Sequence, residues 1–154
     1  GEIGHICVND DETEVCGCGN KGCLEQYTSA TGIVRMAKII LNTTDKPSKL
    51  RQTQYISAKE IFDAAKEGDE VAATLVENHG KVLGKALAQI ACVVDPEIFV
   101  IGGGVSRAGD ILINTTAKYF AQYAFHACRQ TKFALATLGN DAGMYGGACS
   151  ILNQ

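Results

Sequence analysis

The sequence of 154 residues has two prolines, no tryptophan and no long apolar run. No stretch approaches the roughly 20 consecutive apolar residues that a membrane-spanning helix needs, so we expect no membrane partner. Basic residues are not in excess: the chain has 14 Lys and Arg and 17 Asp and Glu, which gives a net charge of −3. A chain with this balance lacks a broad positive surface for a phosphate backbone, and we expect no nucleic acid to bind it.

A methionine is missing from position 1, and the opening residues Gly1-Glu2-Ile3-Gly4-His5 resemble the interior of a protein. We therefore interpret the chain as a piece of a longer protein or as a processed product. A signal-peptide pattern is also missing. Hydrophobic residues make up 46% and charged residues 20% of the chain, which is typical of one globular domain with a sizeable core.

Cysteine is the exception to this sparse composition, with seven residues, an odd number. Four of them are scattered in apolar or alanine-rich surroundings: Cys7, Cys92, Cys128 and Cys149. Without a signal peptide, this distribution argues against the disulfide framework of a secreted domain and predicts a reducing, cytoplasmic location. We expect the four scattered cysteines to be buried as small hydrophobic residues.

The other three, Cys16, Cys18 and Cys23, lie within eight residues and alternate with glycines at positions 17, 19 and 22. Glycine lets the backbone fold tightly enough to aim three sulfur atoms at one point. Zinc takes four sulfur or nitrogen ligands in a tetrahedron, and His5 is the nearest candidate for the fourth. The pattern predicts a closed Cys3His zinc knuckle within residues 5–25. The alternative is a set of unliganded or redox-active thiols on a mobile loop.

The apolar pattern predicts strands alternating with helices, which indicates an α/β domain with a partly parallel sheet. Strands are predicted over 3–8, 97–101 and 132–138, and helices over 24–41, 57–65, 69–94, 109–123 and 141–152, with a polar loop over 42–55. The run over 98–101 is apolar throughout, which is typical of a strand in a parallel sheet buried on both faces. Gly32 could interrupt the first helix. Ser57 and Glu60 match a capping box, and Asp69 is placed to cap the longest helix. We expect His79, on that helix, to be a core residue.

Two groups of residues around these elements suit ligand binding. Gly102, Gly103 and Gly104 follow a strand, where backbone N–H groups can meet phosphate or ribose oxygens. The same glycines could equally form a plain strand-to-helix turn. Near the knuckle, Glu2, His5 and Glu25 offer donors and acceptors for sugar hydroxyls. Alternatively, Glu25 is a helix-start acid that the helix dipole favours, and Glu2 is solvated surface.

Taken together, these motifs resemble the ROK family of bacterial sugar kinases and sugar-responsive repressors, and most of all its glucokinase-like members. The residues that carry the resemblance are Gly1-Glu2-Ile3-Gly4-His5, the segment from Cys16 to Glu25, Ser29-Ala30-Thr31-Gly32, Ile101-Gly102-Gly103-Gly104-Val105 and 141–148. The resemblance extends over essentially the whole chain.

This resemblance implies an actin-like, ribonuclease-H-like kinase fold of two lobes, of which residues 1–154 form the C-terminal lobe. It implies that His5, Cys16, Cys18 and Cys23 bind zinc, that Glu2, His5 and Glu25 contact a hexose such as glucose, and that Gly102, Gly103 and Gly104 approach the nucleotide. It also implies that the intact protein uses ATP with Mg²⁺ and forms a homodimer.

The family's phosphate loop, D-x-G-G-T, and its catalytic Asn-Asp pair do not occur at the expected places in this sequence. Asn140-Asp141 precedes an Ala/Gly-rich helix, so we interpret it as a helix cap and not as a catalytic base. We therefore expect no catalytic residue in this chain and no activity from the chain alone. The sequence leaves three functions to compare: part of an ATP-dependent glucokinase, the sensing lobe of a repressor whose DNA-binding domain lies upstream, and a zinc-binding interaction module.

Overall fold

The structure, a computed structural model, describes residues 1–152, with the side chain of Asn140 excepted. Its α-helices are α1 (Glu25–Thr28), α2 (Ala30–Thr43), α3 (Ala58–Lys66), α4 (Glu70–Val94), α5 (Asp110–Tyr123) and α6 (Ala142–Leu152). Its strands are β1 (Ile98–Ile101) and β2 (Lys132–Leu135). Short 3₁₀ turns cover Ile3–His5, Lys49–Gln52, Gly104–Ala108, His126–Cys128 and Gly139–Asp141.

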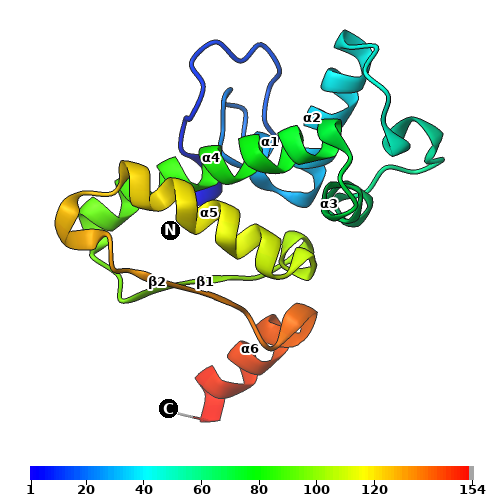
Figure 1. Ribbon diagram of the computed structural model, residues 1–154. Coiled ribbons are helices and arrows are strands. Elements are labelled where there is room, and N and C mark those ends of the chain that lie inside the picture. The colour runs from blue at the N-terminus through cyan, green and yellow to red at the C-terminus, as the bar shows by residue number, and fades with distance from the viewer. Residues whose placement is uncertain (153–154) are drawn as a thin grey trace.

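Helix α4 is the centre of the fold, with α1, α2 and α3 packed on one side and α5 on another. Figure 1 shows α5 between α4 and the two strands, and α6 beyond the strands. Asp69 begins α4 as the sequence predicts: its carboxylate accepts from the N–H of Ala72 at 2.9 Å and from the N–H of Lys49 at 2.7 Å. Because one carboxylate serves both segments, it also attaches the loop before Lys49 to the core.

The main core lies where α2, α3 and the first half of α4 meet. Its largest fully buried side chains include Ile33, Leu50, Phe62 and Leu75. His79 is buried there too, as predicted, with its ring edge-on to Phe62. Its Nε2 lies 2.9 Å from the carbonyl oxygen of Thr28, so this nitrogen carries the proton and donates it. Burial lowers the pKa of His79, which keeps the ring neutral inside the core.

Strands β1 and β2 are parallel, from Ile98 opposite Lys132 to Ile101 opposite Leu135, which confirms the parallel pairing. The expectation that β1 is buried on both faces was wrong. Phe99 packs against Phe120 of α5 on one face, but Val100 is 61% exposed because no described element covers the other face. β2 also ends three residues earlier than predicted, at Leu135.

Three other local expectations were wrong. Residues 3–5 form a 3₁₀ turn instead of a strand, and only Cys7 pairs in β fashion, with Cys23. The first long helix is interrupted at Ser29, not at Gly32: the Ser29 side chain caps α2 by accepting from the N–H of Gly32. Among the scattered cysteines only Cys128 is buried, and Cys7, Cys92 and Cys149 are exposed.

Helix α6 differs from the other helices because none of its described residues is buried, although Met144, Tyr145, Ile151 and Leu152 are large and apolar. Asp141 lies in the 3₁₀ turn just before it; the side chain of Asn140, its proposed partner in a cap, lies outside the described residues. Across residues 1–152, no helix combines the length and the apolar character that crossing a bilayer requires.

Candidate metal and sugar site

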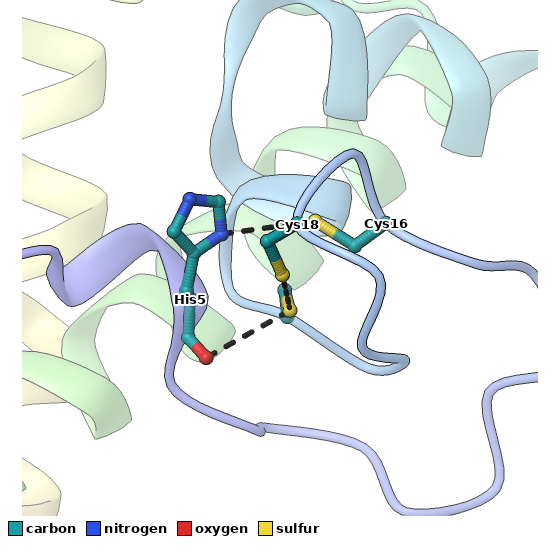
Figure 2. Close-up of side chains that lie close together, drawn as sticks. His5, Cys16 and Cys18 are labelled. Atoms are coloured by element: carbon teal, nitrogen blue, oxygen red, sulfur yellow. Dashed lines mark hydrogen bonds between the residues drawn. The ribbon is translucent and has the colours of Figure 1, made fainter.

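The four residues predicted to bind zinc lie together in the structure. One ligand atom from each of His5, Cys16, Cys18 and Cys23 lies within 4.8 Å of the other three. Figure 2 shows the histidine ring and the sulfur atoms converging from three segments of the chain. Nδ1 of His5 is 3.7 Å from Sγ of Cys16, and the Sγ atoms of Cys18 and Cys23 are 3.6 Å apart.

The two separations of 3.6 and 3.7 Å fit the edge of a tetrahedral zinc site, and the outer limit of 4.8 Å for the set is longer than such an edge. With Zn–S bonds of about 2.3 Å and Zn–N bonds of about 2.0 Å, the edges of such a tetrahedron are roughly 3.5–3.8 Å. A sulfur–sulfur separation of 3.6 Å matches that edge and is far longer than a disulfide bond. The donor set, three thiols and one imidazole, is also one of the sets found in closed structural zinc sites.

The knuckle is folded by short backbone links. Two antiparallel bridges close it, Cys7 with Cys23 and Val15 with Lys21. Within the tip, the N–H of Cys16 donates to the carbonyl of Asn20, and the N–H of Gly19 donates back to the carbonyl of Cys16. The fold of the tip therefore brings Cys16 and Cys18 back beside Cys23, at the start of α1.

Glu25, in the first turn of α1, is next to the cluster. Its Oε1 accepts from the Cys16 thiol at 2.9 Å and lies 3.8 Å from Nδ1 of His5. A backbone N–H at Cys18 lowers the pKa of the Cys16 thiol, but the hydrogen bond to Glu25 and burial outweigh it and raise the pKa to about 12. The nearby backbone N–H of Asn20 lowers the pKa of Cys18.

The predicted sugar residues are therefore partly assembled. His5 and Glu25 lie side by side and are each partly exposed, with 33% and 42% of their side-chain surface accessible. Glu2 precedes the 3₁₀ turn that presents His5, and its carbonyl accepts the N–H of His5 at 3.1 Å. Its side chain is exposed and makes no recorded contact with Glu25 in the described part of the chain, so the structure brings only its backbone to the cluster.

The glycine turn after β1 lies near the same helices. A Cβ on Gly104 would be 3.1 Å from Cβ of Ala30, the first residue of α2. Gly103 has φ +79°, a left-handed conformation that glycine adopts at little cost. The turn at 102–104 therefore approaches the start of α2, which follows α1 directly at Ser29.

Sequence reasoning missed the residues that hold the knuckle against the helices. Arg35 of α2 forms ion pairs with Glu12 and Glu14, each with an N–O distance of 2.6 Å. Tyr27 donates its hydroxyl proton to Glu12 at 2.5 Å. The only signal in the sequence was the acidic run over residues 9–14, before the cysteines.

A family model described as the ROK family matches residues 1–154. The chain belongs to the ROK family. A glucokinase of Halalkalibacterium halodurans is 42% identical over 159 aligned residues, covering 100% of this chain and 48% of that protein. The DNA-binding transcriptional repressor Mlc of Escherichia coli is 31% identical, covering 97% of this chain and 36% of that protein.

The fold of this ROK chain is also that of solved relatives. A crystal structure of a ROK family glucokinase from Streptomyces griseus, in complex with glucose and AMPPNP, superposes with a TM-score of 0.83 at 35% identity, covering 96% of this chain and 49% of that one. The chain thus spans about half the length of these glucokinases, and it has the mixed α/β architecture of the corresponding half of a sugar kinase.

A glycine in the knuckle of this ROK chain gives a first test of the site. Gly22 has φ +70°, and a Cβ there would overlap the carbonyl oxygen of Asn9. We expect Gly22→Ala to stop the knuckle from closing, with loss of bound zinc after dialysis and a lower melting temperature. Gly19→Ala is the matched control, because Gly19 also has positive φ but faces open space, and it carries only the strain of roughly 1 kcal/mol. Equal zinc loss in both variants would contradict this view of Gly22.

Proposed function

We propose that this chain is the sugar-binding and nucleotide-contacting part of an ATP-dependent hexose kinase of the glucokinase type. The observation that carries the proposal is the convergence of His5, Cys16, Cys18 and Cys23 beside Glu25. The similarity to glucokinases over the whole chain supports it. In the intact protein, ATP with Mg²⁺ supplies the phosphoryl group, which passes to a hexose hydroxyl.

Zinc in this proposal is structural: bound to the four residues, it would close the knuckle. Its geometry suggests a link to the sugar. Cys16 bound as a thiolate has no proton to donate, so Oε1 of Glu25 would be released from the Cys16 thiol and become available to accept from a sugar hydroxyl. Nδ1 of His5 faces Cys16, which leaves Nε2 of the same ring to face the sugar.

The chain's own residues orient the substrates in this proposal, and the remainder of the protein supplies the carboxylate that deprotonates the hydroxyl. Glu2, His5 and Glu25 would hold hexose hydroxyls, and Gly102, Gly103 and Gly104 would lie against the nucleotide. Residues 1–154 correspond to the C-terminal lobe. A cytoplasmic location and a homodimer are parts of the same proposal.

Glucose titration tests the sugar site directly. We expect the zinc-loaded chain to bind glucose saturably in a calorimeter, and Glu25→Gln to weaken this binding by tenfold or more because a sugar hydroxyl loses a charged acceptor. Glu70→Gln is the control, since Glu70 is also an acid in the first turn of a helix but lies away from the cluster. If both variants weaken binding equally, or wild type binds no glucose, the sugar role of Glu25 is wrong.

The second candidate is the sensing lobe of a sugar-responsive repressor, favoured by the similarity to Mlc. Both candidates predict sugar binding, so the nucleotide separates them. A kinase part should show slower amide exchange at 102–104 when Mg-ATP is added, and a repressor part should not. Ordinary glucose-dependent ATP turnover by this chain alone would contradict the assignment of the catalytic base to the rest of the protein.

A further inference from the structure

The loop between His5 and Cys16 has a defined shape although residues 9–14 contain neither helix nor strand. Glu12 lies at its centre with a side chain only 9% exposed. Its Oε1 accepts from the backbone N–H groups of Thr13 and Glu14, and its Oε2 accepts from Arg35 and Tyr27. Both oxygens of the carboxylate are thus used, which is how a nearly buried charge is stabilised.

Arg35 links this loop to two helices at once. From α2, its Nη2 donates to Glu12 and its Nε to Glu14, while Nη1 donates to the carbonyl of Gln26 in α1 at 3.3 Å. The arginine side chain is 21% exposed. A planar guanidinium with several fixed donors can hold three groups in one geometry, which a lysine cannot do.

Tyr27 and Gln26 of α1 reinforce these contacts. The hydroxyl of Tyr27 accepts from Nδ2 of Asn9 at 2.8 Å while donating to Glu12, and the side chain of Gln26 donates to the carbonyl of Glu14 at 3.1 Å. The hydrogen bond from Tyr27, a backbone N–H at Glu14 and the charge of Arg35 together lower the pKa of Glu12 to about 2. The loop therefore stays charged and attached at any physiological pH.

The position of this attachment matters for the metal ligands. Backbone hydrogen bonds and a bridge within the tip fold the segment that carries Cys16 and Cys18. The other two ligands lie outside this tip: His5 precedes the loop, and Cys23 lies just before the start of α1. Glu14 is two residues before Cys16. Whatever fixes Glu14 against α2 therefore also fixes the direction in which the tip presents its two sulfur atoms to His5 and Cys23.

We propose that Arg35 is the positioning residue of the Cys3His cluster: by binding Glu12 and Glu14 it arranges the thiols before the metal arrives and slows the metal's release. This inference rests on the proposed zinc site. This role differs from a general contribution to the stability of the fold, because most exposed ion pairs contribute little to the free energy of unfolding. Within residues 1–152, the ion pairs made by Lys49, Lys59, Lys66 and Lys118 do not involve the loop that precedes the cysteines.

The chain offers a matched control arginine. Arg51 also donates from Nε, Nη1 and Nη2 to three separate groups, the carbonyls of Lys46, Leu41 and Thr44, and it fixes a different loop. Arg51→Gln and Arg35→Gln each remove a guanidinium that donates to three groups, although two of the Arg35 acceptors are carboxylates and those of Arg51 are neutral carbonyls. A comparison of the two separates an effect on the cluster from a loss of overall stability.

The experiment measures zinc release from the zinc-loaded chain to a chromophoric chelator such as 4-(2-pyridylazo)resorcinol. We expect Arg35→Gln to release zinc about tenfold faster or more, the scale for residues that support metal ligands, with Arg35→Lys in between and Arg51→Gln unchanged. Melting temperatures of all variants are measured beside the rates. The proposal is wrong if Arg35→Gln releases zinc at the wild-type rate, or if Arg51→Gln accelerates release equally.

A wild-type chain that takes up no zinc would count against the zinc proposal itself, and thiol labelling then tests Arg35 separately. Cys16 is buried in the structure. In the metal-free chain, we expect iodoacetamide to modify Cys16 faster in Arg35→Gln than in Arg51→Gln, as read by peptide mass spectrometry. Equal labelling of Cys16 in the two variants would overturn the positioning role.

Discussion

Replacing Cys18 by serine is expected to remove zinc from the chain and to lower its melting temperature by about 10 °C when zinc is in excess. Serine is close to cysteine in size, and Cys18 is exposed, so the substitution itself disturbs little packing. The effect comes from the lost ligand. A metal that binds only the folded chain adds about 4 kcal/mol at a thousandfold excess over its dissociation constant, and a domain of this size loses roughly 2–4 °C per kcal/mol.

Cys7→Ser is the control for this prediction. Cys7 is also exposed and pairs across the antiparallel bridge with Cys23, but it is not one of the four converging residues. Native mass spectrometry should show one added mass of about 65 Da in wild type and Cys7→Ser, and none in Cys18→Ser. Zinc retained by Cys18→Ser, or lost equally from both variants, would refute the Cys3His assignment and the sugar site built on His5.

Local signals account for what the sequence predicted correctly. The spacing of three cysteines among glycines, together with His5, gave a cluster that the structure brings within 4.8 Å. The capping box at Ser57 and Glu60 and the Asp69 cap are confirmed. The sequence could predict them because each depends on residues only three positions apart. Such contacts are encoded within one turn of chain, so they can be recognised without knowledge of the fold.

What the sequence did not predict depends on distant partners. Arg35 meets Glu12 across 23 positions, and the acidic run around Glu12 does not indicate which basic residue pairs with it. The apolar run of β1 was interpreted as buried on both faces, yet Val100 is exposed because burial depends on which elements lie above the sheet. Residues 3–5 were expected to be a strand, but a short apolar run does not distinguish a strand from a 3₁₀ turn.

Gly32 shows how a long-range contact changes the meaning of a glycine. It lies inside α2, where the sequence suggested an interruption, and the helix continues through it. A Cβ at this position would overlap the carbonyl oxygen of Glu25 and lie 2.9 Å from the carbonyl carbon of Gln26. The same carbonyl of Glu25 accepts from the hydroxyl of Ser29 at 2.7 Å. Glycine therefore lets α2 approach the backbone of α1 directly behind the proposed sugar-binding carboxylate.

Gly32→Ala is accordingly expected to destabilise the chain by about 2 kcal/mol, since overpacking against rigid backbone costs roughly 1–3 kcal/mol and outweighs the helix preference of alanine. It should also weaken glucose binding, because α1 must shift and carry Glu25 with it.

Gly146→Ala, in α6, is the opposite case: a Cβ there meets open space, and stability should rise by up to about 1 kcal/mol. Denaturant titrations and glucose calorimetry on both variants test this contrast. If Gly32→Ala stabilises the chain as Gly146→Ala does, or keeps wild-type glucose affinity, then the contact between α1 and α2 does not position Glu25.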